Sequence, residues 1–149
     1  MNSIDIDVFS CEQMNDFGNK LAKNLPSGTV VALLGDLGAG KTTLVRGVAK
    51  GLNISEVVQS PTFNIMKLYL KGDRPLIHID AYRLADLDTD IGLDEYIGYE
   101  TGLTMIEWPL FIEKLLPDNT LFIEISITGE NSRHVHIYSK DESLLEAIR

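Results

Sequence analysis

A glycine-rich turn between an apolar run and an amphipathic stretch is the feature that most restricts how this chain can fold. Residues 29–34, "TVVALL", are short, apolar and rich in β-branched side chains, which is typical of a strand buried on both faces. Beyond the turn, apolar residues recur at helical spacing from Leu44 to Leu52, and we expect Gly51 to end that helix in the left-handed conformation. The turn reads "GDLGAGKT" and fits G-x-x-x-x-G-K-[ST], a pattern found between a strand and a helix. The sequence therefore predicts a strand, a phosphate-binding loop (the P-loop, residues 35–42) and a helix.

The residue types of the P-loop suit a bound anion. Gly35, Gly38 and Gly40 allow backbone N–H groups to surround a phosphate without interference from Cβ atoms. The N-terminus of the following helix adds its partial positive charge. In this pattern Lys41 reaches the β- and γ-phosphates, and the hydroxyl of Thr42 binds Mg²⁺. We therefore predict a site for a nucleoside triphosphate and Mg²⁺.

Outside the P-loop, strands alternate with helices and are followed by a hairpin. Apolar residues alternate with polar ones over residues 4–8, and Ser10 with Gln13 forms a capping box that predicts a helix start. Further strands are expected at residues 63–70, 76–80 and 102–108 and in an antiparallel hairpin of 120–128 and 133–139, with short helices at 86–99, 109–117 and 141–149. This order predicts one domain, residues 1–149, with a P-loop NTPase-like α/β fold and a mixed parallel and antiparallel sheet flanked by helices.

Composition narrows the possible partners and the compartment. The chain has 13 basic and 22 acidic residues, a formal net charge of −9, and no basic cluster. Because neutralisation of phosphates by basic residues dominates nucleic-acid affinity, we expect the chain not to bind DNA or RNA directly. No apolar stretch reaches the roughly 20 residues of a membrane span, and the N-terminus lacks the basic region of a secretory signal. The single cysteine, Cys11, suits a reducing cytoplasm.

Two acidic residues stand at the ends of apolar runs. Asp80 closes "LIHID" and Glu107 closes "TMIE", and ligand groups of α/β sheets gather at the carboxyl ends of such strands. Hydrolysis at a P-loop needs an acid near Mg²⁺ and a group that orients the attacking water. We expect at least one of the two acids to serve there, and the spacing leaves open which one. Trp108 follows Glu107 directly, so we expect its side chain on the opposite side of the strand.

Several other polar residues have both a chemical and a structural interpretation. Thr62 in "QSPTF" lies where many P-loop proteins carry a γ-phosphate-sensing loop, although a plain turn explains it equally well. Arg133 is a candidate nucleotide contact at the start of the last strand. His78 is interpreted as a packing residue of its strand. His134 and His136 share a strand face without a third ligand nearby, which argues against zinc.

Four segments in order resemble one family. "GDLGAGKTT", "SPTF", "HIDAYRL" and "IEW" are similar to segments of the bacterial TsaE (YjeE) proteins, and the likeness extends from about Val30 to Ile125. The resemblance implies a small cytoplasmic ATPase that binds ATP and Mg²⁺ and turns over slowly alone. It also implies a role in forming N6-threonylcarbamoyladenosine at position 37 of tRNAs that read codons beginning with A. The implied partners are TsaB and TsaD, of which TsaD transfers the threonylcarbamoyl group.

The resemblance also assigns residues. It places the nucleotide on Gly35, Asp36, Leu37, Gly38, Ala39, Gly40, Lys41, Thr42, Thr43 and Thr62, and Arg133 is added as our own candidate. It implies catalytic roles for Lys41, Asp80 and Glu107, with Thr42 and Glu107 as the Mg²⁺ ligands and Trp108 beside them. The chain departs from the family pattern where Pro109 and Leu110 follow the tryptophan, since members often carry a small residue and an acid there. If TsaB and TsaD hold the tRNA, an acidic chain can act on it indirectly, and hydrolysis would reset the partner complex.

Three other functions stay open. A nucleotide-gated scaffold would use the same loop without significant turnover. A small-molecule kinase usually needs several arginines around the transferred phosphate, and this chain has five in scattered positions. A GTPase would need the guanine-reading Asn-Lys-x-Asp motif, which the sequence lacks. We therefore place the partner-stimulated ATPase first, then the scaffold, the kinase and the GTPase.

Overall fold

Seven strands form one sheet in the computed structural model, which describes residues 2–36, 38–59, 66–81, 95–108 and 113–149. The order across the sheet is β1-β7-β6-β2-β5-β4-β3. The strands are β1 (Ser3–Val8), β2 (Val30–Leu34), β3 (Met66–Tyr69), β4 (Leu76–Asp80), β5 (Leu103–Glu107), β6 (Leu121–Ile127) and β7 (Arg133–Tyr138). The helices of the described residues are α1 (Cys11–Asn24), α2 (Lys41–Gly51) and α3 (Glu142–Ile148).

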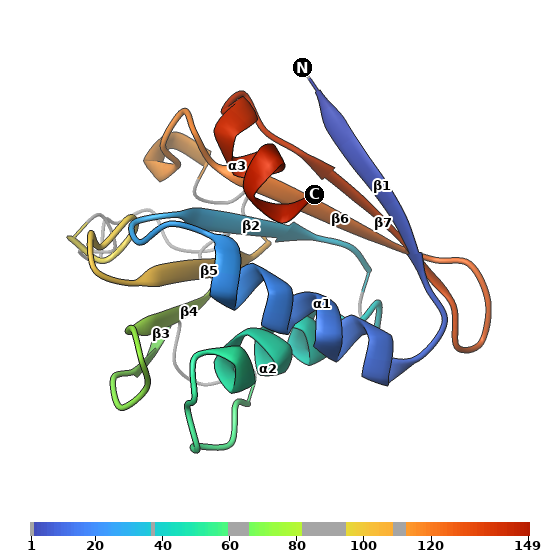
Figure 1. Cartoon of the computed structure of the whole chain (residues 1–149), viewed down its shortest axis with the longest axis horizontal. Helices are drawn as coiled ribbons and strands as arrows, with labels where there is room; N and C mark the ends of the chain where they lie inside the picture. The colour runs from blue at the N-terminus through green and yellow to red at the C-terminus, as the bar shows by residue number, and fades with distance from the viewer. Residues whose placement is uncertain (1, 37, 60–65, 82–94, 109–112) are drawn as a thin grey trace.

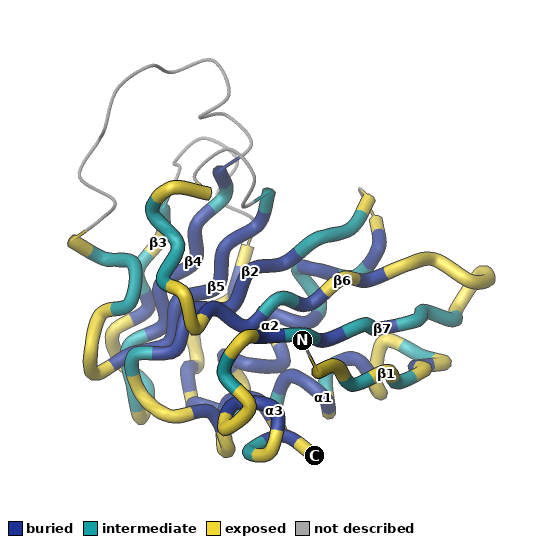
Figure 2. The backbone as a smooth tube through the Cα atoms, turned by 90° about the horizontal axis from the view of Figure 1, so that it is seen from above, coloured by how far each residue is buried: buried dark blue, intermediate teal, exposed yellow. Residues whose placement is uncertain are grey.

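The middle of the sheet is parallel and both of its ends are antiparallel. β2 pairs in parallel with β5 and β6, and β4 pairs in parallel with β5. β3 is antiparallel to β4, and at the other end β7 and then β1 join β6 in antiparallel pairs. β2, β4 and β5 are buried along most of their length (Figure 2), as apolar parallel strands should be. The predicted mixed sheet is therefore confirmed, and the carboxyl ends of these three strands meet at one edge.

The three helices pack on one face of the sheet (Figure 1). Their apolar faces form the main core with inward-facing residues of the strands, among them Val31 and Leu33 of β2. A smaller core lies on the other face around Ile77, Ile79 and Ile106, and the partly buried residues packed against it are Met66, Leu68, Tyr96, Ile97, Leu115 and Leu116. Among the helices described, none has both the length and the apolar character that a membrane span requires.

The first helix begins as the sequence predicts. The Ser10 hydroxyl accepts a hydrogen bond from the Gln13 amide (3.1 Å), and the Gln13 side chain accepts one from the amide of Phe9 (2.7 Å). Of the helices predicted at 86–99 and 109–117, residues 86–94 and 109–112 lie outside the described residues, and 113–115 form a single 3₁₀ turn. The predicted strand at 63–70 is described from Met66 onward, as β3.

Glycines allow α1 and α2 to cross at very short distance. A Cβ atom on Gly47 would lie 2.4 Å from the carbonyl oxygen of Asn15, and one on Gly18 would lie 2.6 Å from that of Leu44. Gly51 serves the same packing, and the expectation of a left-handed Gly51 is wrong. The left-handed residue after α2 is Asn53, with φ of 60°. The P-loop helix is thus held tightly against α1, because no side chain separates the two backbones.

Candidate functional site

The P-loop connects the end of β2 to the first residue of α2. Gly40, the N-cap of α2, has φ of 112°, a conformation that side chains disfavour, and no side chain of the described residues caps the helix. A Cβ atom on Gly35 would lie 2.7 Å from the carbonyl oxygen of Ile125 in β6, so the loop leaves the sheet against its neighbour strand. First-turn amides without a capping side chain are free to bind an anion. The local geometry therefore matches the predicted phosphate cradle.

Lys41 lies with its ammonium group inside this turn. The residue is 5% exposed, and its Nζ atom donates a hydrogen bond of 2.8 Å to the carbonyl oxygen of Gly35. Burial lowers the pKa of Lys41, and the nearby negative charges of Glu107, Asp80 and Asp36 oppose that shift. The ammonium group is therefore partly desolvated, which strengthens its attraction for a phosphate.

The two predicted acids lie side by side at the same edge. Asp80 ends β4 and Glu107 ends β5, and they are partners in the register of the parallel pair. Glu107 is 5% exposed, and its Oε2 atom lies 2.8 Å from Nε2 of His78, a residue that is fully buried. The structure thus brings Lys41, Asp80 and Glu107 together, as the sequence predicts for catalytic groups. It also adds His78, interpreted from the sequence as packing alone.

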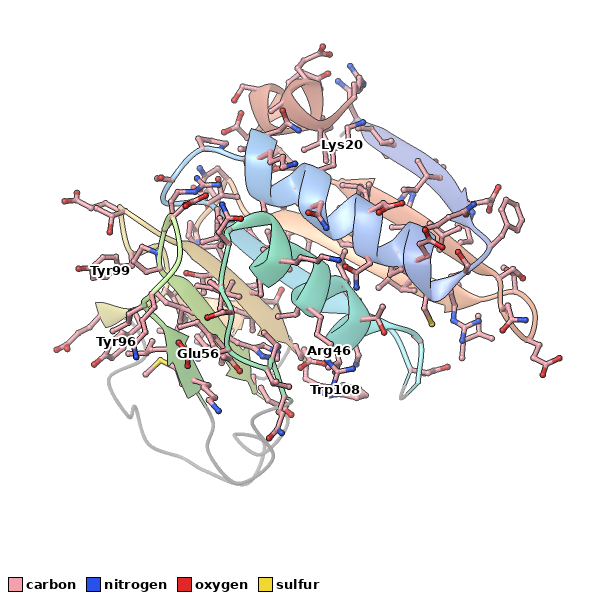
Figure 3. The ribbon with its side chains drawn as sticks, turned by 60° about the horizontal axis from the view of Figure 1, so that its bottom comes forward. Lys20, Arg46, Glu56, Tyr96, Tyr99 and Trp108 are labelled. Atoms are coloured by element: carbon pink, nitrogen blue, oxygen red, sulfur yellow. The ribbon has the colours of Figure 1, made fainter. Side chains whose placement is uncertain are left out.

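Trp108 corrects a prediction from strand alternation. The residue was expected to lie on the opposite side from Glu107, but β5 ends at Glu107 and Trp108 has φ of 57°. This turn of the backbone brings the indole ring to Lys41, whose Nζ atom lies 3.9 Å from the ring centroid. Figure 3 shows Trp108 beside the first turns of α2. Glu107 and Trp108 therefore both face the ammonium group, one through charge and one through a cation–π contact.

Arg133 joins the far hairpin to the P-loop. Its Nε atom donates to the carbonyl oxygen of Ala39 at 3.0 Å and its Nη2 atom approaches that of Gly38 at 3.4 Å. Its Nη1 atom donates to the carbonyl oxygens of Gly129 and Ser132 in the β6–β7 connection. The side chain thus lies against the loop that would hold the nucleotide. Direct contact with a nucleotide stays a prediction.

Comparison with known proteins places the chain in a family. The family model described as "Threonylcarbamoyl adenosine biosynthesis protein TsaE" matches residues 8–135. The chain belongs to the TsaE family. The "tRNA threonylcarbamoyladenosine biosynthesis protein TsaE" of Bacillus subtilis (strain 168) is 47% identical over 108 residues, which are 72% of this chain and 68% of the relative. The protein of the same name from Treponema pallidum (strain Nichols) is 38% identical over 130 residues, 86% of this chain and 95% of the relative.

A solved structure confirms the fold. The crystal structure of Bacillus subtilis YdiB superposes on this chain with a TM-score of 0.85 and 33% identity, covering 99% of this chain and 94% of the other. The resemblance found in the sequence is therefore confirmed. This TsaE chain belongs to a family that takes part in tRNA threonylcarbamoyladenosine biosynthesis. Its matched span contains every candidate site residue, although Leu37 and Thr62 lie outside the described residues.

The oxygen groups of this TsaE chain fit Mg²⁺ bound together with phosphate. Thr42 lies in the first turn of α2. The Glu107 carboxylate is near enough to the P-loop that its negative charge raises the pKa of Lys41. Within the described residues, no group of three or more His, Cys, Asp or Glu side chains could hold a metal ion. Mg²⁺ is usually bound by one or two carboxylates, with phosphate oxygens and water as the other ligands. The available hydroxyl and carboxylate match that mode.

A hollow beside the P-loop provides room for a ligand. Its volume is about 680 Å³, and its lining residues are Leu33, Leu34, Gly35, Asp36, Trp108, Glu124, Ile125, Ser126 and Ile127. Small-molecule sites commonly have volumes of about 300–1,000 Å³. The hollow lies along the carboxyl ends of the paired strands β2 and β6, so a ligand there would contact the start of the loop and Trp108.

Proposed function

We propose that this TsaE chain is a Mg²⁺-dependent ATPase that acts with TsaB and TsaD in forming the threonylcarbamoyl group on adenosine 37 of tRNAs reading ANN codons. The observation that carries the proposal is the buried Lys41 ammonium group, which lies in the P-loop with Glu107, Asp80 and Asp36 around it. A cation in that position suits the β- and γ-phosphates of ATP. Membership of the TsaE family supports the pathway.

In this proposal each side chain of the site has a separate role. Lys41 binds the phosphates, and the first-turn amides of α2 bind their oxygens. Thr42 and Glu107 hold Mg²⁺, which when bound offsets the negative charge that develops on the phosphate oxygens. Asp80, beside Glu107 on the next strand, orients the attacking water or shares that task with Glu107. The indole of Trp108 keeps the ammonium group of Lys41 in place.

The charge of the chain supports an indirect role toward RNA. With a formal net charge of −9, the chain would bind a polyanion poorly unless partners held it. We propose that TsaB and TsaD hold the tRNA in the cytoplasm and that hydrolysis resets their complex. Tight binding of tRNA by the purified chain at physiological salt, with no partner present, would contradict this arrangement.

The deciding experiment measures ATP turnover with and without purified TsaB and TsaD. We expect slow turnover alone, a clear increase with the partners, and loss of ATP binding in Lys41→Met. Glu107→Ala should retain assembly with the partners and lose turnover. If the wild-type chain assembles in the presence of ATP but shows no turnover in the complex, a nucleotide-gated scaffold is the better description. A phosphorylated metabolite as product would indicate a kinase, and preference for GTP over ATP would indicate a GTPase.

A further inference from the structure

A buried imidazole lies directly behind the Glu107 carboxylate. His78 is 0% exposed and stands in the middle of β4, one strand away from Glu107. On the same face, Leu76 precedes it by two positions and Met105 is its partner on β5, both part of the main core, whereas Asp80 follows it at the sheet edge and the exposed Lys67 is its partner on β3. Its Nε2 atom lies 2.8 Å from Oε2 of Glu107. The buried imidazole thus has the Glu107 carboxylate as its polar contact among the described residues.

We propose that His78 is a positioning residue that holds the Glu107 carboxylate in the orientation needed for Mg²⁺. The inference rests on the proposed function, in which Glu107 binds the ion. The Nε2–H group of His78 donates to one carboxylate oxygen of Glu107 from within the sheet. At the sheet edge, the negative charge of the same carboxylate raises the pKa of Lys41. The carboxylate therefore lies between the imidazole and the P-loop. Hydrogen bonds of this kind fix the orientation of metal-binding carboxylates.

The second ring nitrogen argues against a purely structural role. Nδ1 of His78 is the one buried side-chain nitrogen or oxygen in the described residues that has no hydrogen-bond partner. Leaving a buried polar atom unpaired lowers the stability of the fold. An apolar side chain beside Leu76 and Met105 would avoid that loss. The presence of an imidazole at this position is therefore best explained by the hydrogen bond between its Nε2 atom and Glu107.

The test compares variants that keep or remove the donor at the Nε2 position. The amide nitrogen of His78→Gln can reach the place of Nε2, whereas His78→Asn is polar but too short, and His78→Met is apolar. The readout is the dissociation constant for Mg²⁺ in the presence of ATP, followed by the fluorescence of Trp108, the one tryptophan of the chain. ATP binding without Mg²⁺ and urea unfolding are measured for each variant, so that damage to the fold is recognised.

We expect His78→Met and His78→Asn to bind Mg²⁺ about 10-fold more weakly or worse, the usual loss when a partner of a metal ligand is removed. His78→Gln should stay within about threefold of wild type, and ATP binding without Mg²⁺ should change little in all three. In a Glu107→Gln background, His78→Met should have no further effect, because His78 acts through Glu107. If His78→Met does not fold, the comparison of His78→Gln with His78→Asn gives the same test.

The outcomes separate this inference from the proposed function. If the wild-type chain binds no ATP with Mg²⁺, alone or in its complex, the proposed function is wrong and the inference is wrong with it. If the wild type binds both but the asparagine and methionine variants match it, only the role of His78 is wrong. A large additional loss from His78→Met in the Glu107→Gln background would also overturn it, since His78 would then act on something else.

Discussion

The backbone of Trp108 offers the sharpest test of the site geometry. Trp108 has φ of 57°, in the left-handed region that bulky side chains rarely adopt. We predict that Trp108→Gly is more stable than Trp108→Ala, the reverse of the usual order. Both substitutions remove the indole and its contact with Lys41, so their difference reports on the backbone alone.

The expected difference follows from two opposing terms. The left-handed conformation costs alanine about 1–2 kcal/mol and costs glycine almost nothing. The greater freedom of glycine in the unfolded chain costs about 0.5–1 kcal/mol relative to alanine. Taking the middle of each range, the free energy of unfolding should therefore be higher for Trp108→Gly by about 0.8 kcal/mol.

Urea unfolding followed by circular dichroism measures this difference, because both variants lack the fluorescent residue. Asn53, with φ of 60°, supplies a positive control, and Asn53→Gly should likewise be more stable than Asn53→Ala. Lys20, exposed within α1, supplies the opposite control, where glycine should be less stable than alanine by about 1 kcal/mol. If Trp108→Ala equals or exceeds Trp108→Gly while both controls behave as expected, the strained backbone at the end of β5 is refuted.

Three further predictions concern the frame of the site. Gly47→Ala should lower the free energy of unfolding, measured in urea, by about 1–3 kcal/mol, because the added Cβ would lie 2.4 Å from the Asn15 carbonyl oxygen. This loss should exceed the gain from the higher helix propensity of alanine, and an increase in stability would refute the close crossing of α1 and α2. Arg133→Met should weaken ATP binding about 5–30-fold in calorimetry, the equivalent of about 1–2 kcal/mol for lost charged hydrogen bonds, whereas unchanged affinity would show that the loop needs no such link. A hydrogen bond to Asp7 raises the pKa of His134 above its ordinary value of 6.5. The protonated His134 therefore stabilises the fold fully below pH 6.5, and this stabilisation is lost as the pH rises through the higher folded-state pKa. The urea midpoint should accordingly fall more between pH 6 and pH 8.5 in wild type than in His134→Gln, and equal slopes would contradict the assignment.

The sequence predicts those parts of the molecule that depend on local patterns. The apolar runs of β2, β4 and β5 and the P-loop pattern are each contained in a few consecutive residues, and all three strands are confirmed. The positions of Asp80 and Glu107 follow from the same patterns, because the carboxyl ends of parallel strands share an edge. These local patterns were therefore enough to predict that the two acids lie near the P-loop.

Contacts between distant segments could not be predicted in this way. His78 and Glu107 are separated by 29 positions, and their contact depends on which strands are neighbours and in what register. Arg133 and Ala39 are 94 positions apart and meet only because β7 lies beyond β6 in the sheet. The error at Trp108 has another cause, since alternation of side chains holds only while the strand continues. One signal was available for His78: it shares a strand face with Asp80, two residues nearer to the expected site.

Three features that lower stability lie at or directly behind the edge where β4 and β5 end. The ammonium group of Lys41 is partly desolvated, the backbone of Trp108 is left-handed, and Nδ1 of His78 has no partner among the described residues. A sheet edge that served packing alone would gain from a neutral side chain, an ordinary turn and an apolar core residue. Strain and unpaired groups concentrate at functional sites because the surrounding fold can hold them there. Each of the three also has a distinct task in the proposed site: a cation for phosphate, a ring that holds the cation, and a donor that holds the acid. Trp108 and His78 lie outside the sequence motif, so these two features support the nucleotide site independently of it.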